Sequence, residues 1–182
     1  MVKLNLACGQ TRLEGFTGVD RVKTDYSDVV HDLLTFPWPF ESNSVEEAYC
    51  SHFVEHIPLA EIDGKDLFFC FFDELYRVLK PGAKAVIICP YGASDRAFQD
   101  PTHRRFIVRS TYAYLNKAWR EANKLDHYAV ECDFACDWQL MPNPEFDLKH
   151  DDAKAFIYSH YWNSVIDIHA TIIKVTRGGE NA

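Results

Sequence analysis

Short apolar runs separated by turns, together with one long apolar stripe, dominate the pattern of the chain. The stripe spans residues 59–79, where apolar side chains recur at spacings of three and four, and it predicts a helix that ends before Pro81-Gly82. Residues 111–124 predict a second helix. The short runs predict seven strands, at residues 3–7, 16–20, 29–33, 45–51, 83–89, 132–140 and 165–175. This alternation predicts a Rossmann-like, doubly wound α/β fold with a mostly parallel seven-stranded sheet.

The last third of the chain departs from this alternation. Little helix is expected between the last two strands, so they predict an antiparallel hairpin at the edge of the sheet. Their connection, about residues 141–164, is long and polar, and predicts either a cap over a site or a partly ordered loop. Residues 177–182 predict a flexible tail. The sequence shows no linker or repeat, so residues 1–182 are expected to form a single domain.

Charge and composition restrict the class of partner. The formal net charge is -8, from 19 basic and 27 acidic residues, which argues against nucleic acid held through its phosphates. No apolar stretch of about 20 residues predicts a membrane span, and the first residues do not resemble a secretion signal. The six cysteines form no C-x-x-C pair and mostly lie in apolar runs. Reduced thiols of this kind predict a cytoplasmic protein.

The richest chemistry lies between Lys3 and Asp20, in the letters K-L-N-L-A-C-G-Q-T-R-L-E-G-F-T-G-V-D. One predicted strand ends at Cys8-Gly9 and the next ends at Asp20. A glycine turn lets the backbone approach a ligand, and a carboxylate at a strand end accepts hydrogen bonds from ribose hydroxyls. Asp20 follows Gly9 too soon for the dinucleotide fingerprint, which places its acid about 20 residues further on. The pattern therefore predicts a nucleoside cofactor held in another way.

Further segments extend this pattern in order along the chain. His31-Asp32-Leu33 ends the third strand, S-H-F-V-E-H-I-P (residues 51–58) follows the fourth, and R-V-L-K-P-G (residues 77–82) precedes the fifth. Together with the first motif, these segments resemble class I S-adenosylmethionine-dependent methyltransferases. The resemblance is to the small branch with an L-N-L-x-C-G first motif and a truncated first helix. It runs from Lys3 to about Pro90, roughly half of the chain.

The resemblance implies an enzyme, an S-adenosylmethionine-dependent methyltransferase, and assigns its cofactor-binding residues. Asp20 would bind the ribose, while Asp32 and Leu33 would hold the adenine. The remaining cofactor-binding residues follow the first and fourth strands: Ala7, Cys8 and Gly9 at the methionine end, and Ser51 and His52 beside the methyl group.

The methyl acceptor is expected to be a small molecule or a sugar, with His103 and Tyr91 nearest to it as catalytic residues. His103 lies in the block D-P-T-H-R-R-F (residues 100–106). An imidazole can accept a proton near neutral pH, so this side chain could take the proton of an O–H or N–H acceptor. Asp100 is predicted to orient the ring.

Two alternatives remain open. Ala7 and Thr11 stand where the family has glycines, which leaves room for a methyltransferase-like binding or assembly module without catalysis. His52-x-x-Glu55-His56 also matches an inverted zinc-peptidase motif, and predicts a zinc hydrolase if both histidines share one helix. Pro58 and the apolar run before His52 leave little helix for that pair, so we expect no bound metal.

Overall fold

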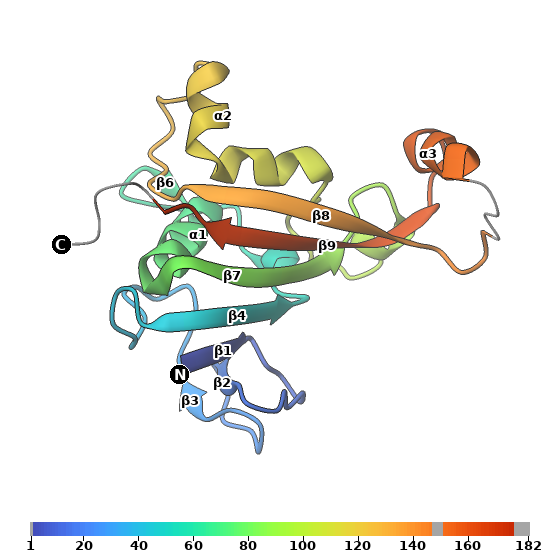
Figure 1. Cartoon of the computed structure of the whole chain (residues 1–182). Coiled ribbons are helices and arrows are strands. Elements are labelled where there is room, and N and C mark those ends of the chain that lie inside the picture. The colour runs from blue at the N-terminus through green and yellow to red at the C-terminus, as the bar shows by residue number, and fades with distance from the viewer. Residues whose placement is uncertain (1, 147–150, 177–182) are drawn as a thin grey trace.

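The computed structural model describes residues 2–146 and 151–176, and seven strands in this part of the chain form one sheet (Figure 1). The strand order is β3-β2-β1-β4-β7-β9-β8. The strands are β1 (Val2–Leu6), β2 (Thr17–Asp20), β3 (Val29–Val30), β4 (Val45–Ser51), β7 (Leu79–Pro90), β8 (Phe134–Pro142) and β9 (Val165–Lys174).

The order and direction of these strands confirm the predicted fold. Neighbours from β3 to β7 are parallel, whereas β9 is antiparallel to β7 and β8 is antiparallel to β9. The chain leaves the centre of the sheet in both directions, through β1, β2 and β3 on one side and through β4 and β7 on the other. The order therefore reverses between β1 and β4, where open α/β sheets place their ligands.

The predicted helix at residues 59–79 is shorter in the structure. Helix α1 spans Leu67–Val78, and the residues before it form a small hairpin of β5 (Glu61–Ile62) and β6 (Lys65–Asp66). Asp63 and Gly64 both have positive φ, 51° and 78°, as a two-residue hairpin turn requires. Asp66 caps the helix, because its side chain accepts a hydrogen bond from the Phe68 amide at 2.7 Å.

The predicted helix at residues 111–124 is divided. A 3₁₀ helix, η3, spans Arg109–Leu115, and α2 spans Lys117–Ala122. Asn116 separates them with extended backbone, φ −97° and ψ 121°. Its side chain caps α2 by accepting from the Trp119 amide at 2.8 Å, and it donates to the Phe134 carbonyl at 2.9 Å.

The connection predicted at residues 141–164 contains regular structure at both ends. Strand β8 continues to Pro142, and helix α3 spans Asp151–His160 beyond the ends of β8 and β9 (Figure 1). Trp162 and Asn163 then donate to the Asp95 carboxylate at 2.5 and 2.6 Å, which fixes the end of the connection to η2 (Asp95–Ala97). The predicted tail, 177–182, lies outside the described residues.

The core lies between one face of the sheet and α1. Phe71, Phe72 and Leu75 of α1 are fully buried against side chains such as Leu4 and Ile87 of the sheet. This packing fixes the strands whose carboxyl ends carry the site. Among the described residues, no helix is both long and apolar enough to cross a membrane.

Candidate functional site

A cleft of 480 Å³ opens at the carboxyl ends of β1, β2 and β3. Its volume is within the range of about 300–1,000 Å³ that is typical of small-molecule sites. It borders the point where the strand order reverses. Its walls are formed by Ala7, Asp20, Arg21, His31, Asp32, Leu33, Leu34, Phe53, His56, Pro58 and Thr102.

The turn after β1 brings Asp20 into this cleft. Ala7 and Gly9 have φ of 52° and 54°, so the backbone turns sharply at the end of the strand. The Gly9 amide donates to one Asp20 carboxylate oxygen at 2.9 Å, and the Val22 amide donates to the other at 3.0 Å. A carboxylate has about four acceptor positions, so Asp20 is held in place and can still accept hydrogen bonds from a ligand.

Ala7→Gly is expected to raise the free energy of unfolding by about 0.5–1 kcal/mol, because a left-handed φ strains an L-residue and costs glycine nothing. Urea unfolding of the wild type and the variant measures the change. Ala48→Gly is the matched control, since Ala48 is fully buried in β4 and should lose stability. A loss of stability in Ala7→Gly would contradict the strain at this turn.

Asp32 and Leu33 reach the same cleft from the end of β3. The Leu34 amide donates to an Asp32 carboxylate oxygen at 2.9 Å, which orients the acid. Leu33 is almost fully buried, and its carbonyl accepts from the Trp38 indole at 3.0 Å. The pair therefore presents a carboxylate beside an apolar side chain that the core holds rigid.

The rest of the wall comes from residues that the sequence did not assign to the cofactor: Arg21, His31, Leu34, Phe53, His56, Pro58 and Thr102. Phe53, His56 and Pro58 follow β4, and Phe53 packs on Phe71 of the core with ring centroids 5.4 Å apart. Their position directly after a strand of the parallel sheet is the feature of the sequence that could have assigned them to the site. Of the predicted residues, Ala7, Asp20, Asp32 and Leu33 line the cleft, whereas Cys8, Gly9, Ser51, His52, Tyr91 and His103 do not.

His103 does not line the cleft, but its ring contacts the ring of His56 edge to face, with centroids 4.7 Å apart. The amides of Arg104 and Arg105 donate to the Glu55 carbonyl at 2.7 and 3.0 Å, and this holds the segment against η1 (Val54–His56). The His103 ring Nδ1 lies 2.9 Å from the Ala97 carbonyl oxygen. A carbonyl only accepts, so Nδ1 carries the hydrogen and Nε2 keeps a free lone pair.

The orienting role predicted for Asp100 is wrong. Its carboxylate is 4.0 Å from His103 Nε2 and instead accepts from the Thr102 amide and hydroxyl, both at 2.7 Å. These hydrogen bonds lower the pKa of Asp100. The Ala97 carbonyl orients the imidazole in its place. Tyr91 is only 8% exposed and packs in the hydrophobic core.

The H-x-x-E-H segment does not adopt the geometry of an inverted zinc-peptidase motif. His52 precedes η1, and its Nδ1 pairs with Glu55 Oε1 at 3.2 Å. Among the described residues, the group with ligand atoms close enough to share one metal ion comprises Glu55, His56 and His103. His52 is not part of this group, so the helical pair required by the zinc-hydrolase alternative is not formed.

The thiols beneath the site do not provide a nucleophile. Burial, with a further effect of the Glu55 carboxylate, raises the pKa of Cys50 well above its usual value. Burial also raises the pKa of Cys8, and the Asp20 carboxylate adds to this effect. Both thiols are therefore protonated near neutral pH, and a covalent cysteine route is disfavoured.

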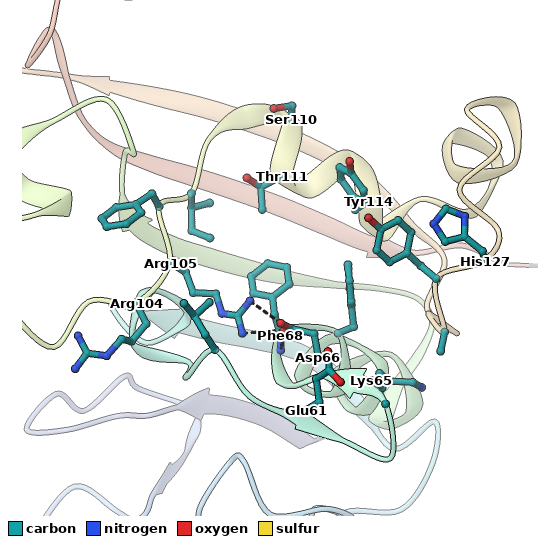
Figure 2. Close-up of a pocket in the computed structure, with 17 residues that line it drawn as sticks. Glu61, Lys65, Asp66, Phe68, Arg104, Arg105, Ser110, Thr111, Tyr114 and His127 are labelled. Atoms are coloured by element: carbon teal, nitrogen blue, oxygen red, sulfur yellow. Dashed lines mark hydrogen bonds and ion pairs between the residues drawn. The ribbon is translucent and has the colours of Figure 1, made fainter.

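A larger cavity, of 750 Å³, borders the next residues of the same segment, 104–107 (Figure 2). Its walls include Phe68 and Tyr114, and three of its charged side chains, those of Lys65, Asp66 and Arg105, are already in ion pairs. Arg105 pairs with Asp66 at 2.8 Å and donates to the carbonyl of Pro58. Pro58 also lines the cleft, so it separates the two cavities. The cleft at the strand ends, whose carboxylates remain accessible, is therefore the better candidate for a cofactor.

Comparison with known proteins shows which fold this is. A methyltransferase from Archaeoglobus fulgidus has 15% identity and a TM-score of 0.61, over 94% of this chain and 85% of that one. Another, from Methanosarcina mazei, has 14% identity and a TM-score of 0.56, over 96% and 92%. The 1,6-didemethyltoxoflavin-N1-methyltransferase of Burkholderia thailandensis, solved with 1,6-didemethyltoxoflavin and S-adenosylhomocysteine, has 13% identity and a TM-score of 0.53, over 96% and 71%.

No protein-family model matches the sequence. No curated protein matches it either. The likeness therefore lies in the arrangement of strands and helices, and the chain has the fold of class I S-adenosylmethionine-dependent methyltransferases.

Proposed function

We propose that the protein is an S-adenosylmethionine-dependent methyltransferase that acts on a small molecule or a sugar. One observation carries this proposal: two carboxylates at the ends of successive strands, Asp20 and Asp32, line one cleft where the strand order reverses. An acid for the ribose and an acid for the adenine amine are the polar contacts that such a nucleoside needs. The net charge of -8 supports an acceptor other than nucleic acid.

The walls of the cleft suggest how the cofactor lies. Asp20 would accept from the ribose hydroxyls, and Asp32 would accept from the adenine amine while Leu33 packs on the ring. The turn from Ala7 to Gly9 would face the methionine end. Phe53 and His56, which also line the cleft, would exclude water from the sulfonium.

Methyl transfer requires few catalytic groups from the protein. The acceptor displaces the methyl group from the sulfonium sulfur, the carbon–sulfur bond breaks as the new bond forms, and the acceptor loses a proton. His103 is suited to take that proton, because its Nδ1 hydrogen bond to Ala97 leaves the Nε2 lone pair free. Ser51 and His52 are proposed to border the methyl group. Tyr91 packs in the core and does not line the cleft, so its proposed contact with the acceptor would require the acceptor to reach the edge of the core.

His103→Ala is expected to leave the affinity for S-adenosylmethionine within about a factor of two, because His103 does not line the cleft. Turnover with an identified acceptor should fall about 10²–10⁴-fold, the typical contribution of a general base. Calorimetry and turnover on the same preparations measure both quantities. A large loss of cofactor affinity would place His103 in the cofactor site and remove it as the base.

The competing function is a binding or assembly module that has kept this fold. Both functions permit cofactor binding, so the test is transfer: radiolabelled methyl from S-adenosylmethionine is offered to fractionated small-molecule extracts. Label that moves into a small molecule with the wild type, and more slowly with Asp20→Ala at a limiting cofactor concentration, supports the enzyme. Stoichiometric cofactor binding without transfer into any fraction would favour the module.

All six cysteines are free thiols, which supports a cytoplasmic location.

A further inference from the structure

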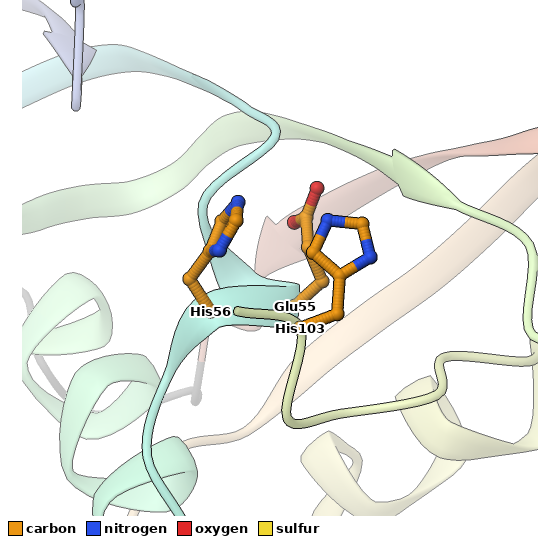
Figure 3. A group of neighbouring side chains, drawn as sticks. All are labelled: Glu55, His56 and His103. Atoms are coloured by element: carbon orange, nitrogen blue, oxygen red, sulfur yellow. The ribbon is translucent and has the colours of Figure 1, made fainter. Parts of the chain in front are cut away.

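We propose that Glu55, His56 and His103 form a binding site for one divalent transition-metal ion of the zinc class. The Glu55 carboxylate lies near the imidazole rings of His56 and His103 (Figure 3), and the two rings meet edge to face with centroids 4.7 Å apart. A nitrogen of each ring and a carboxylate oxygen all lie within 4.8 Å of one another. Two imidazoles and one carboxylate, with a further position open, are a common ligand set for zinc and for non-haem iron.

Hydrogen bonds at the far nitrogens prepare both rings as ligands. Nδ1 of His103 donates to the Ala97 carbonyl at 2.9 Å. Nδ1 of His56 lies 3.0 Å from the Thr102 hydroxyl, which itself donates to Asp100 at 2.7 Å and so accepts from the ring. Each Nε2 therefore keeps its lone pair. Metal-binding histidines typically have this kind of partner on the other nitrogen, because it fixes the tautomer and the ring orientation.

Glu55 provides a second and independent observation. The residue is 1% exposed, and its Oε2 has no hydrogen-bond partner among the described residues. Its other oxygen, Oε1, accepts from His52 Nδ1 at 3.2 Å, which orients the carboxylate. A buried carboxylate oxygen without a partner is costly. A cation held between Glu55 and the two rings would remove this cost.

The spacing suits an ion after a small closure of the side chains. Bonds of about 2.0–2.2 Å in a tetrahedral site place ligand atoms about 3.4 Å apart, so separations of up to 4.8 Å would have to shorten by up to about 1.4 Å. The backbone is already held for this, since the Arg104 and Arg105 amides bind the Glu55 carbonyl. His56 also lines the cofactor cleft, so the open position would be reached from there.

This site differs from the one that the sequence motif predicts. The motif would use His52 and His56 with Glu55 as a base, whereas the structure makes Glu55 a ligand and replaces His52 with His103. The inference stands apart from the proposed function, because ion binding needs no cofactor. Nε2 of His103 would bind either the ion or the proton of the acceptor, but not both at once. His103 would therefore be a ligand in the metal-bound protein and a base in the metal-free protein.

The test is a zinc titration of the full chain after dialysis against a chelator, in competition with a chromophoric chelator. We expect one ion per chain. His56→Ala, His103→Ala and Glu55→Gln should each weaken binding by about 100-fold or more, since loss of an outer partner alone costs about 10–100-fold. His52→Ala, which removes only the hydrogen bond to Glu55, should cost no more than that range. His31→Ala, at another wall of the same cleft, is the matched control and should bind like the wild type.

Cobalt substitution gives a result that does not depend on the variants folding. The wild type with one equivalent of Co²⁺ should show the visible absorption of a site with low coordination number. Far-ultraviolet circular dichroism checks that each variant is folded. No stoichiometric ion in the wild type would overturn the inference. Binding that depends on His52 and is unaffected by His103→Ala would overturn it in favour of the sequence motif.

Discussion

Replacing Asp20 with alanine is expected to weaken the binding of S-adenosylhomocysteine by about 1–3 kcal/mol, a loss of roughly 5–150-fold in affinity. The ribose hydroxyls would lose an ionised acceptor. The Gly9 amide, which now donates to Asp20 at 2.9 Å, would lose its partner in the turn. Calorimetric titration of the wild type and the variant measures the difference.

A matched control separates the contact from the change of charge. Asp25 is an exposed acid on the loop after β2 and does not line the cleft. Asp25→Ala alters the net charge equally and should leave affinity unchanged. Equal losses in both variants would show a general electrostatic effect, and no loss in Asp20→Ala would remove Asp20 from the cofactor site.

Phe71→Ala is expected to lower the free energy of unfolding by about 3–5 kcal/mol, since it removes a fully buried ring from the core. The ring lies 5.5 Å from Trp38, 5.4 Å from Phe53 and 5.1 Å from Phe72, centroid to centroid. A domain typically has about 5–15 kcal/mol of stability in total, so this loss is large. Urea unfolding followed by tryptophan fluorescence measures it.

Phe69 provides the comparison for this prediction. It lies on the same helix but is only partly buried, so Phe69→Ala should cost clearly less than Phe71→Ala. Equal costs would contradict the assignment of Phe71 to the centre of the core. Phe53 packs on Phe71 and also lines the cleft, so Phe71→Ala should weaken cofactor binding as well.

The strands could be predicted because their burial in the sheet requires short runs of apolar residues, which are visible in the sequence. The prediction for residues 45–51 coincides with β4. The antiparallel edge pair was also predicted, but the expectation of little helix between its strands was wrong, because α3 lies between β8 and β9. The helices were less predictable. The apolar stripe that begins at Leu59 continues into α1, but Asp63-Gly64 favours a hairpin turn, and this turn prevails. Asn116 similarly divides the second helix by capping.

The sequence predicted the site residues only where polar side chains come directly after a predicted strand. Asp20 and Asp32 could be assigned because an acid at the end of a parallel strand faces the ligand edge of the sheet. The partnership of Glu55 with His103 could not, because 48 positions separate them and backbone hydrogen bonds from residues 104 and 105 bring them together. Asp100 was misassigned because its proximity to His103 in the sequence does not reveal that its carboxylate accepts hydrogen bonds from Thr102.

The most direct test of the account is calorimetric titration of the wild-type chain with S-adenosylhomocysteine, the product form of the cofactor. The cleft at the ends of β1, β2 and β3 predicts one site per chain with a dissociation constant in the micromolar range, about −8 kcal/mol. Crosspeaks in nitrogen–proton spectra should shift for Gly9, Asp20 and Leu33. The absence of both heat and spectral shifts at millimolar ligand would contradict the account.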